Sequence, residues 1–168
     1  MHFLTDEESA AWCEGWVEMA PSDVPVPLYR HPPYARVPLQ AETAFCRQLE
    51  QALQPRDELL LWVTSWGVWR SSENLHLYYR LRQSYGDPRR LQDAPGHLFH
   101  PHEAADLVSF LQVGILCGWD MHLISSEGYA RLFVSHDEFA DFAANEANPY
   151  LLGEFVAAHA DARIVRPG

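Results

Sequence analysis

Residues Gly96–Asn145, GHLFHPHEAADLVSFLQVGILCGWDMHLISSEGYARLFVSHDEFADFAAN, decide the fold of this chain. The run 107–117 has no charged side chain, which is typical of a helix that is buried on most sides. Pro101 suits the first turn of such a helix, and Gly118 suits its C-cap. We therefore predict a buried helix over residues 102–117.

Two segments of alternating apolar and polar residues follow this helix. Trp119–Ser125 and Tyr129–Ser135 are separated by a short turn that contains Gly128, so they predict a β-hairpin. Ser135 and Glu138 then have the S-x-x-E spacing of a capping box, in which a hydroxyl and a carboxylate satisfy the first free amides of a helix. We therefore expect a further helix directly after the hairpin.

The elements outside this stretch are predicted from start signals and from hydrophobic periodicity. Thr5 and Glu8 form another capping-box pattern, which predicts a helix over Thr5–Met19. The run after Asp57 fits a buried strand, although its spacing also matches a helix, and that choice stays open. The remaining predicted ranges are 41–53, 72–85 and 148–159 for helices, and 57–64 and 162–165 for strands.

Residues 21–40 contain six of the twelve prolines of the chain. Proline fixes φ and lacks an amide donor, so we expect an extended, polyproline-like segment that lies on the surface rather than a strand of a sheet.

These patterns together predict a single α+β domain that spans residues 1–168. A small, mainly antiparallel sheet contains the 119–135 hairpin and the strand 57–64. It packs on the buried helix 102–117, and further helices surround it.

Composition excludes several classes of function. The chain has no lysine and a net charge of −11, so it lacks Schiff-base and Walker-type lysine chemistry and is poorly suited to binding nucleic acid. It has no apolar run long enough for a membrane helix, and its start does not resemble a signal peptide. An odd set of cysteines in apolar stretches, Cys13, Cys46 and Cys117, indicates reduced thiols and a cytoplasmic location.

The histidines offer two alternatives for chemistry. His97, His100 and His102 form an H-x-x-H-x-H pattern that could ligate a metal, although the spacing matches no established metal motif and we expect neither a metal nor a cofactor. His122, His136 and Asp137 are the alternative acid–base set, although no nucleophile completes a triad with them.

A surface for a protein partner is the favoured functional feature. Tryptophan and arginine are the residue types that concentrate binding energy in interfaces. The predicted partner-binding residues are Trp66, Trp69, Arg80, Arg82, Arg89 and Arg90.

The favoured hypothesis is therefore a non-catalytic protein-interaction domain. Small acidic cytoplasmic domains of this kind include bacterial immunity proteins, which inhibit a basic nuclease toxin, and this analogy rests on charge and size alone. Two alternatives stay open: a small histidine-dependent hydrolase that could use a metal, and a small-molecule sensor. The sequence leaves the oligomeric state and the identity of any partner undetermined.

Overall fold

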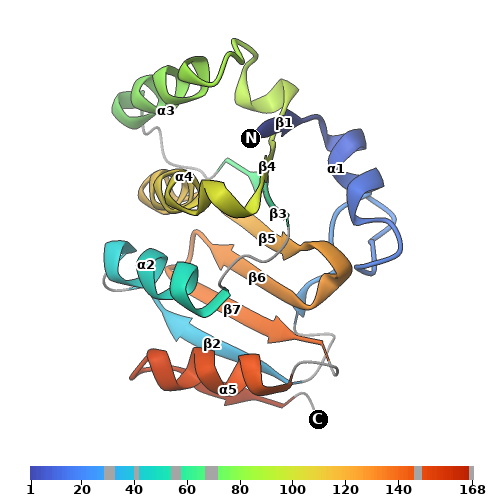
Figure 1. Cartoon of the computed structure of the whole chain (residues 1–168), viewed down its shortest axis with the longest axis vertical. Helices are drawn as coiled ribbons and strands as arrows, with labels where there is room; N and C mark the ends of the chain where they lie inside the picture. The colour runs from blue at the N-terminus through green and yellow to red at the C-terminus, as the bar shows by residue number, and fades with distance from the viewer. Residues whose placement is uncertain (29–32, 40–41, 54–57, 67–71, 146–148, 167–168) are drawn as a thin grey trace.

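The computed structural model describes residues 1–28, 33–39, 42–53, 58–66, 72–145 and 149–166. These residues form an eight-stranded sheet with the order β1-β4-β3-β5-β6-β7-β2-β8, and every strand pairs with its neighbours in an antiparallel sense (Figure 1). The strands are β1 (His2–Leu4), β2 (Tyr34–Pro38), β3 (Leu59–Ser65), β4 (Gly96–Phe99), β5 (Asp120–Ser125), β6 (Ala130–Ser135), β7 (Phe139–Ala144) and β8 (Arg163–Val165). The helices are α1 (Asp6–Cys13), α2 (Glu42–Leu53), α3 (Ser72–Ser84), α4 (Ala104–Leu116) and α5 (Pro149–Ala158).

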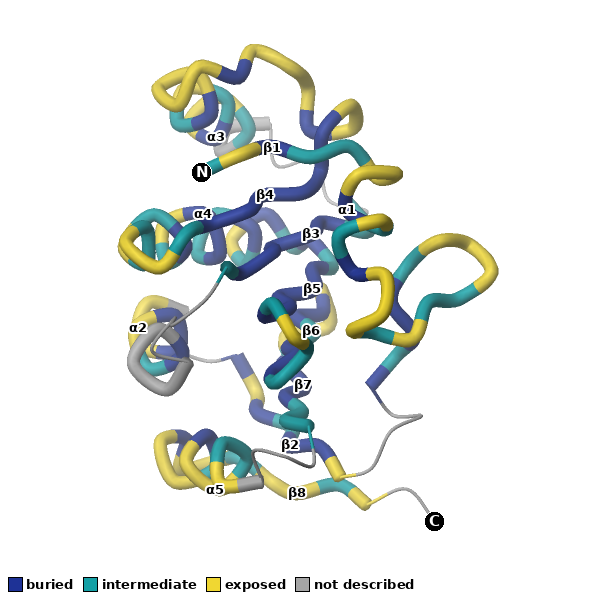
Figure 2. The backbone as a smooth tube through the Cα atoms, turned by 45° about the vertical axis from the view of Figure 1, so that its right-hand side comes forward, coloured by how far each residue is buried: buried dark blue, intermediate teal, exposed yellow. Residues whose placement is uncertain are grey.

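The helices divide unequally between the two faces of the sheet. Figure 2 shows α2, α3, α4 and α5 on one side of the sheet, and α1 with the loop that follows it on the other side. The alternation of side chains along β3 explains why both faces are apolar there: Leu61 joins the large cluster under the four helices, and Trp62 joins the small cluster under α1. The fold is therefore a mixed α+β domain whose main core lies under α2–α5.

The predicted hairpin and several of the predicted helices are confirmed. β5 and β6 pair along their length and are joined by a turn in which Gly128 has a φ of 62°. Met121 lies on the face toward the helices and Ile124 on the face toward α1, as the alternation predicts. The helices predicted over 41–53, 72–85 and 148–159 correspond to α2, α3 and α5, and the strands predicted over 57–64 and 162–165 correspond to β3 and β8.

The helix that we predicted over residues 102–117 is shorter and less deeply buried than expected. α4 spans Ala104–Leu116 rather than 102–117, and its buried residues follow one face of the helix, whereas Leu116 is 56% exposed. The reason is that α4 lies in an outer layer of the fold, so only one side of it meets the sheet. Gly114 lies on the buried side, where a Cβ atom would overlap the side chain of Met121.

The helix predicted after the hairpin is wrong. Residues 139–144 form strand β7, which is bonded to β6 on one side and to β2 on the other. Ser135 and Glu138 belong to the tight turn between β6 and β7, and Glu138 has a positive φ of 62° that no helix contains. The sheet is consequently larger than predicted.

The N-terminal part of the chain also differs from the prediction. α1 ends at Cys13 rather than at Met19. The proline-rich segment is not wholly a surface segment, because Tyr34–Pro38 forms β2, which lies inside the sheet between β7 and β8. Its strand pairing is compatible with proline because Pro38 is the last residue of β2. Within this segment, residues 29–32 and 40 lie outside the described part of the chain.

Each of the helices in the described ranges is too short, too polar or both to cross a lipid bilayer.

Candidate functional site

An acidic groove lies on the α1 side of the sheet, between α1, the loop that follows it and the end of β3. Its volume is about 700 Å³, and it is open to solvent. Its lining combines four carboxylates with small apolar and hydroxyl groups. The lining residues are Asp6, Glu7, Ala10, Ala11, Glu14, Met19, Ser22, Asp23, Val24, Trp62 and Thr64.

The wall formed by α1 follows from helical spacing. Glu7, Ala11 and Glu14 recur at intervals of four and three residues, so they lie on one face of the helix. The small side chain of Ala11 leaves the groove open between the two glutamates. Thr5 caps this helix through a hydrogen bond from the Glu8 amide of 3.2 Å, and the Glu8 carboxylate accepts the Thr5 amide at 2.8 Å, so the predicted capping box is confirmed.

A hydrogen bond fixes the floor of the groove to α1. The indole Nε1 of Trp62 donates a hydrogen bond of 2.9 Å to Oδ1 of Asp6. Trp62 is fully buried, so its indole N–H needs this acceptor. The bond therefore holds one carboxylate of the groove over β3.

The opposite wall is a compact turn in the loop after α1. The Ala20 amide donates to the Val24 carbonyl at 2.8 Å, and the Asp23 amide donates to the Ala20 carbonyl at 2.9 Å. Asp23 has a φ of 54°, a conformation that aspartate tolerates better than most residues. Met19 and Pro25 close the base of this turn as an isolated antiparallel bridge. The turn thus places the Asp23 carboxylate across the groove from α1.

The groove has a strong charge and a limited chemical repertoire. None of the described lining residues is an arginine or a histidine, so no cation of the lining compensates its carboxylates. Ser22 and Thr64 supply hydroxyl groups, but the part of the lining that the structure describes contains no imidazole to activate them. This arrangement suits the binding of a cationic group better than acid–base or nucleophilic catalysis.

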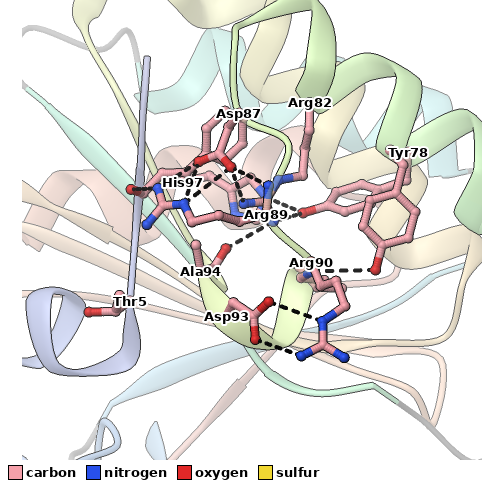
Figure 3. Close-up of polar contacts among 12 residues, drawn as sticks. Thr5, Tyr78, Arg82, Asp87, Arg89, Arg90, Asp93, Ala94 and His97 are labelled. Atoms are coloured by element: carbon pink, nitrogen blue, oxygen red, sulfur yellow. Dashed lines mark hydrogen bonds and ion pairs between the residues drawn. The ribbon is translucent and has the colours of Figure 1, made fainter.

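The predicted partner-binding arginines lie elsewhere, and one of them is internal. Arg82 is fully buried. Its Nη1 donates hydrogen bonds to the Tyr78 hydroxyl at 3.0 Å and to the Ala94 carbonyl at 2.9 Å (Figure 3). Its guanidinium group also lies 4.3 Å from the centre of the Phe3 ring. Its Nη2 is 3.6 Å from Oδ1 of Asp87. A buried side chain with these partners has a structural role, so Arg82, which we predicted as a partner-binding residue, is not exposed on the surface of this structure.

Two of the other arginines are paired with acids on the connection between α3 and β4. Arg89 donates to the Asp87 carboxylate at 2.6 Å and to the Phe3 carbonyl at 2.8 Å. Arg90 donates from Nε to Asp93 at 3.0 Å (Figure 3). Arg89 therefore ties this connection to β1, and the Arg90–Asp93 pair is local to the connection itself.

The remaining predicted contact residues do not form one surface with these arginines. Arg80 is exposed on α3. Trp66 is half-buried and packs against the main core at the end of β3. Trp69 lies outside the described residues.

The structure does not bring together the three histidines of the H-x-x-H-x-H pattern. His97 is buried in β4, where the Tyr78 hydroxyl lies 2.6 Å from its Nε2 and the Leu61 carbonyl 3.2 Å from its Nδ1. Burial lowers the pKa of His97 to about 3, so this imidazole is neutral. His100 and His102 are stacked outside the core, with ring centres 5.9 Å apart. Within the described ranges, no three histidine, cysteine or acidic side chains are arranged to hold a metal ion.

The residues of the acid–base alternative combine a buried histidine with an exposed one. His122 is buried against the Phe133 ring, and its pKa is lowered to about 3 by burial and, to a smaller extent, by Arg131. His136 is exposed in the turn between β6 and β7, where its Nδ1 lies 2.8 Å from Oδ1 of Asp120, and this hydrogen bond raises its pKa. Asp137 is a more distant neighbour, with Oδ1 3.5 Å from Nε2 of His136.

Sequence reasoning missed the acidic groove. The acidic residues in the first turn of α1 are expected there in any case, because the helix dipole favours negative charge at that end. The available signal was the spacing of Glu7 and Glu14 on one helical face together with an alanine between them. No local pattern showed that Asp23 would line the same groove as this helix.

No protein-family model, curated protein or solved structure is significantly similar to this chain.

Proposed function

We propose that this protein is a non-catalytic interaction domain that binds a basic segment of a partner protein in the acidic groove. The observation that carries the proposal is the groove itself, in which Asp6, Glu7, Glu14 and Asp23 line about 700 Å³ of open space and no basic side chain stands among the described lining residues. The net charge of −11 adds a long-range field of the same sign.

Physical chemistry favours lysine or arginine side chains as the occupant. A cation within about 4 Å of an exposed carboxylate gains on the order of 1 kcal/mol in water and more where the pair is partly shielded. Several carboxylates around one groove allow several such contacts at once, and none of the described lining residues carries a positive charge that would repel a cationic ligand. Association with a basic protein would also be accelerated by the field, in a manner that salt suppresses.

The test uses a fluorescently labelled hexa-arginine peptide and the full chain, with anisotropy as the readout. A groove variant carries Glu7→Gln, Glu14→Gln and Asp23→Asn. The control variant carries Asp137→Asn, Glu138→Gln and Glu154→Gln, which are exposed carboxylates that do not line the groove. The two variants have equal net charge, so they separate a local site from the general field.

We expect the groove variant to lose about tenfold or more in affinity at low ionic strength, while the control variant stays within about twofold of the unmodified protein. Equal losses in the two variants would show that the peptide responds only to net charge. Undiminished binding by the groove variant would place the site elsewhere. Either result overturns the proposal, provided that circular dichroism shows both variants to be folded.

A further inference from the structure

A second groove lies on the same face of the sheet, at the end farthest from β1. One cross-strand row of side chains runs along this face; it is buried at its start on β3 and β5 and exposed at its end on β8. Its members are Trp62, His122, Phe133, Asp141, Arg36 and Arg163. In the described part of the chain, α1 and its loop cover the first members of this row, and no helix lies over β2 and β8 on this side (Figure 2).

Arg36 is held in a fixed orientation at this uncovered end. Its Nε and Nη2 each donate a hydrogen bond of 2.6 Å to the carboxylate of Asp141, which is buried in β7. The guanidinium also lies over the Phe139 ring, 4.0 Å from its centre. The hydrogen bond to Asp141 raises the pKa of Arg36, so the side chain stays charged.

The paired edge of the guanidinium leaves its other edge available. A guanidinium has five N–H donors, and the bidentate pair with Asp141 uses two of them. The other N–H groups point away from that carboxylate because the group is planar and its donors diverge. The Arg36 side chain remains 29% exposed, so these donors can reach a ligand.

Arg163 stands directly beside Arg36 in the sheet. The two residues are partners in the register of β2 and β8, so their side chains share this face. Like charges in such positions repel each other. Arg163 is exposed, and no ion pair holds it within the described structure.

The two arginines line a groove of about 390 Å³ with Pro38, Phe139 and Asp161. We propose that this groove binds an oxyanion, a carboxylate or a phosphate, between the guanidinium groups of Arg36 and Arg163. An oxyanion there would offset the repulsion between the two guanidinium groups. It would also accept hydrogen bonds from the N–H groups of Arg36 that Asp141 leaves unused. This site is independent of the acidic groove and of the function proposed for it.

Asp161 limits which ligands can enter. Its carboxylate lies at the same groove and opposes a second negative charge, so binding should be weak and should strengthen when this charge is removed. The arrangement thus predicts a gain in affinity from Asp161→Asn as well as a loss from Arg163→Gln.

The experiment follows the arginine Nε–Hε signals of the full chain by ¹H–¹⁵N spectroscopy. Sodium phosphate and sodium acetate are titrated separately at constant ionic strength, with sodium chloride as the reference. We expect saturable shifts of the Arg36 and Arg163 signals with at least one oxyanion, a loss of about tenfold in affinity for Arg163→Gln, and tighter binding for Asp161→Asn. Arg90→Gln, which removes an exposed arginine outside the groove, should bind as the unmodified protein does.

The two probes distinguish the sources of the oxyanion. Shifts with phosphate alone identify a phosphate site, and shifts with acetate alone identify a carboxylate site. Shifts no larger than those caused by chloride overturn the proposal, and so does unchanged binding by a folded Arg163→Gln variant. Both variants used to locate the site alter exposed residues, so neither removes a core contact.

Discussion

The indole N–H of Trp62 donates a hydrogen bond of 2.9 Å to the carboxylate of Asp6, and this contact joins the centre of the sheet to the first turn of α1. Trp62 is fully buried, whereas Asp6 is exposed, so the bond lies at the boundary between the small core cluster and the acidic groove. Both the packing of α1 on the sheet and the shape of the groove therefore depend on this hydrogen bond.

This bond should be measurable in a double-mutant cycle. Trp62→Phe removes the donor and Asp6→Ala removes the acceptor, so their coupling isolates the interaction from the loss of packing. We expect a coupling of about 1–2 kcal/mol in the free energy of unfolding, because the acceptor is charged and the donor is buried. Urea denaturation of the four proteins in the cycle measures it, and purely additive losses would refute the role that we give to the bond.

Stability should fall in acid because buried imidazoles must stay neutral. Burial lowers the pKa of His97 and of His122 to about 3 in the folded state, against 6.5 for a free imidazole. The unfolded chain therefore binds more protons between these values, and the free energy of unfolding decreases as the pH falls from 6.5 toward 3, by about 1.4 kcal/mol per pH unit for each group.

His122→Leu tests the contribution of one imidazole. Between about pH 4.5 and 6, we expect this substitution to reduce the slope of unfolding free energy against pH by about one proton. His76→Gln removes an exposed imidazole and serves as the control. The slopes of the two variants must be compared because His136 has the opposite effect on stability. The hydrogen bond to Asp120 raises the pKa of His136, so the stability that His136 contributes is present at low pH and is lost as the pH rises. An unchanged slope for His122→Leu would show that its imidazole is not neutral and buried.

Asp87 should matter far more to stability than Asp93, although each carboxylate pairs with an arginine. Asp87 is the counter-ion of the buried Arg82, so Asp87→Ala leaves a buried charge without compensation and should destabilise the fold by about 3–5 kcal/mol. Asp93 pairs with Arg90 at the surface, where water and salt screen the pair, so Asp93→Ala should have a much smaller effect on stability. Denaturant unfolding compares the two, and similar losses would contradict the structural role of Arg82.

Two helical glycines should respond to alanine with opposite signs. Alanine favours a helix by about 1 kcal/mol relative to glycine. Gly153 lies on the exposed side of α5 with nothing near the added Cβ, so Gly153→Ala should raise stability by about that amount. At Gly114 the Cβ would lie 2.7 Å from Cε of the buried Met121, so crowding should outweigh the helical gain.

For Gly114→Ala we expect a net loss of about 1–2 kcal/mol in the free energy of unfolding. The smaller side chain in Met121→Val should restore part of that loss in the double variant. A stabilising effect of Gly114→Ala alone would mean that Met121 can move away freely.

Local chemistry was sufficient for those elements whose signals lie within a few residues. The capping box at Thr5 and Glu8, the glycine turn of the β5–β6 hairpin and the uncharged run of α4 depend on hydrogen bonds and periodicities that operate over one or two turns. The same kind of signal was misleading at Ser135 and Glu138, because the spacing of a capping box also occurs in a turn between strands.

Residues 139–144 show why such a signal can fail. Phe139 and Phe142 fit one face of a helix, but they also fit opposite faces of a strand. Strands β6 and β2 offer hydrogen bonds on both sides, and those long-range partners settle the choice. A prediction from local sequence has no access to them.

The sequence by itself determined the α+β class, the hairpin, the helices α2, α3 and α5 and the negative charge, because each depends on composition or on short-range periodicity. Only the tertiary structure decided that Arg82 is internal, that Asp23 lines the same groove as Glu7 and that Arg36 lies beside Arg163. The physical reason is that a side chain acquires its partners from strand order and layer packing, which bring together residues that are far apart along the chain.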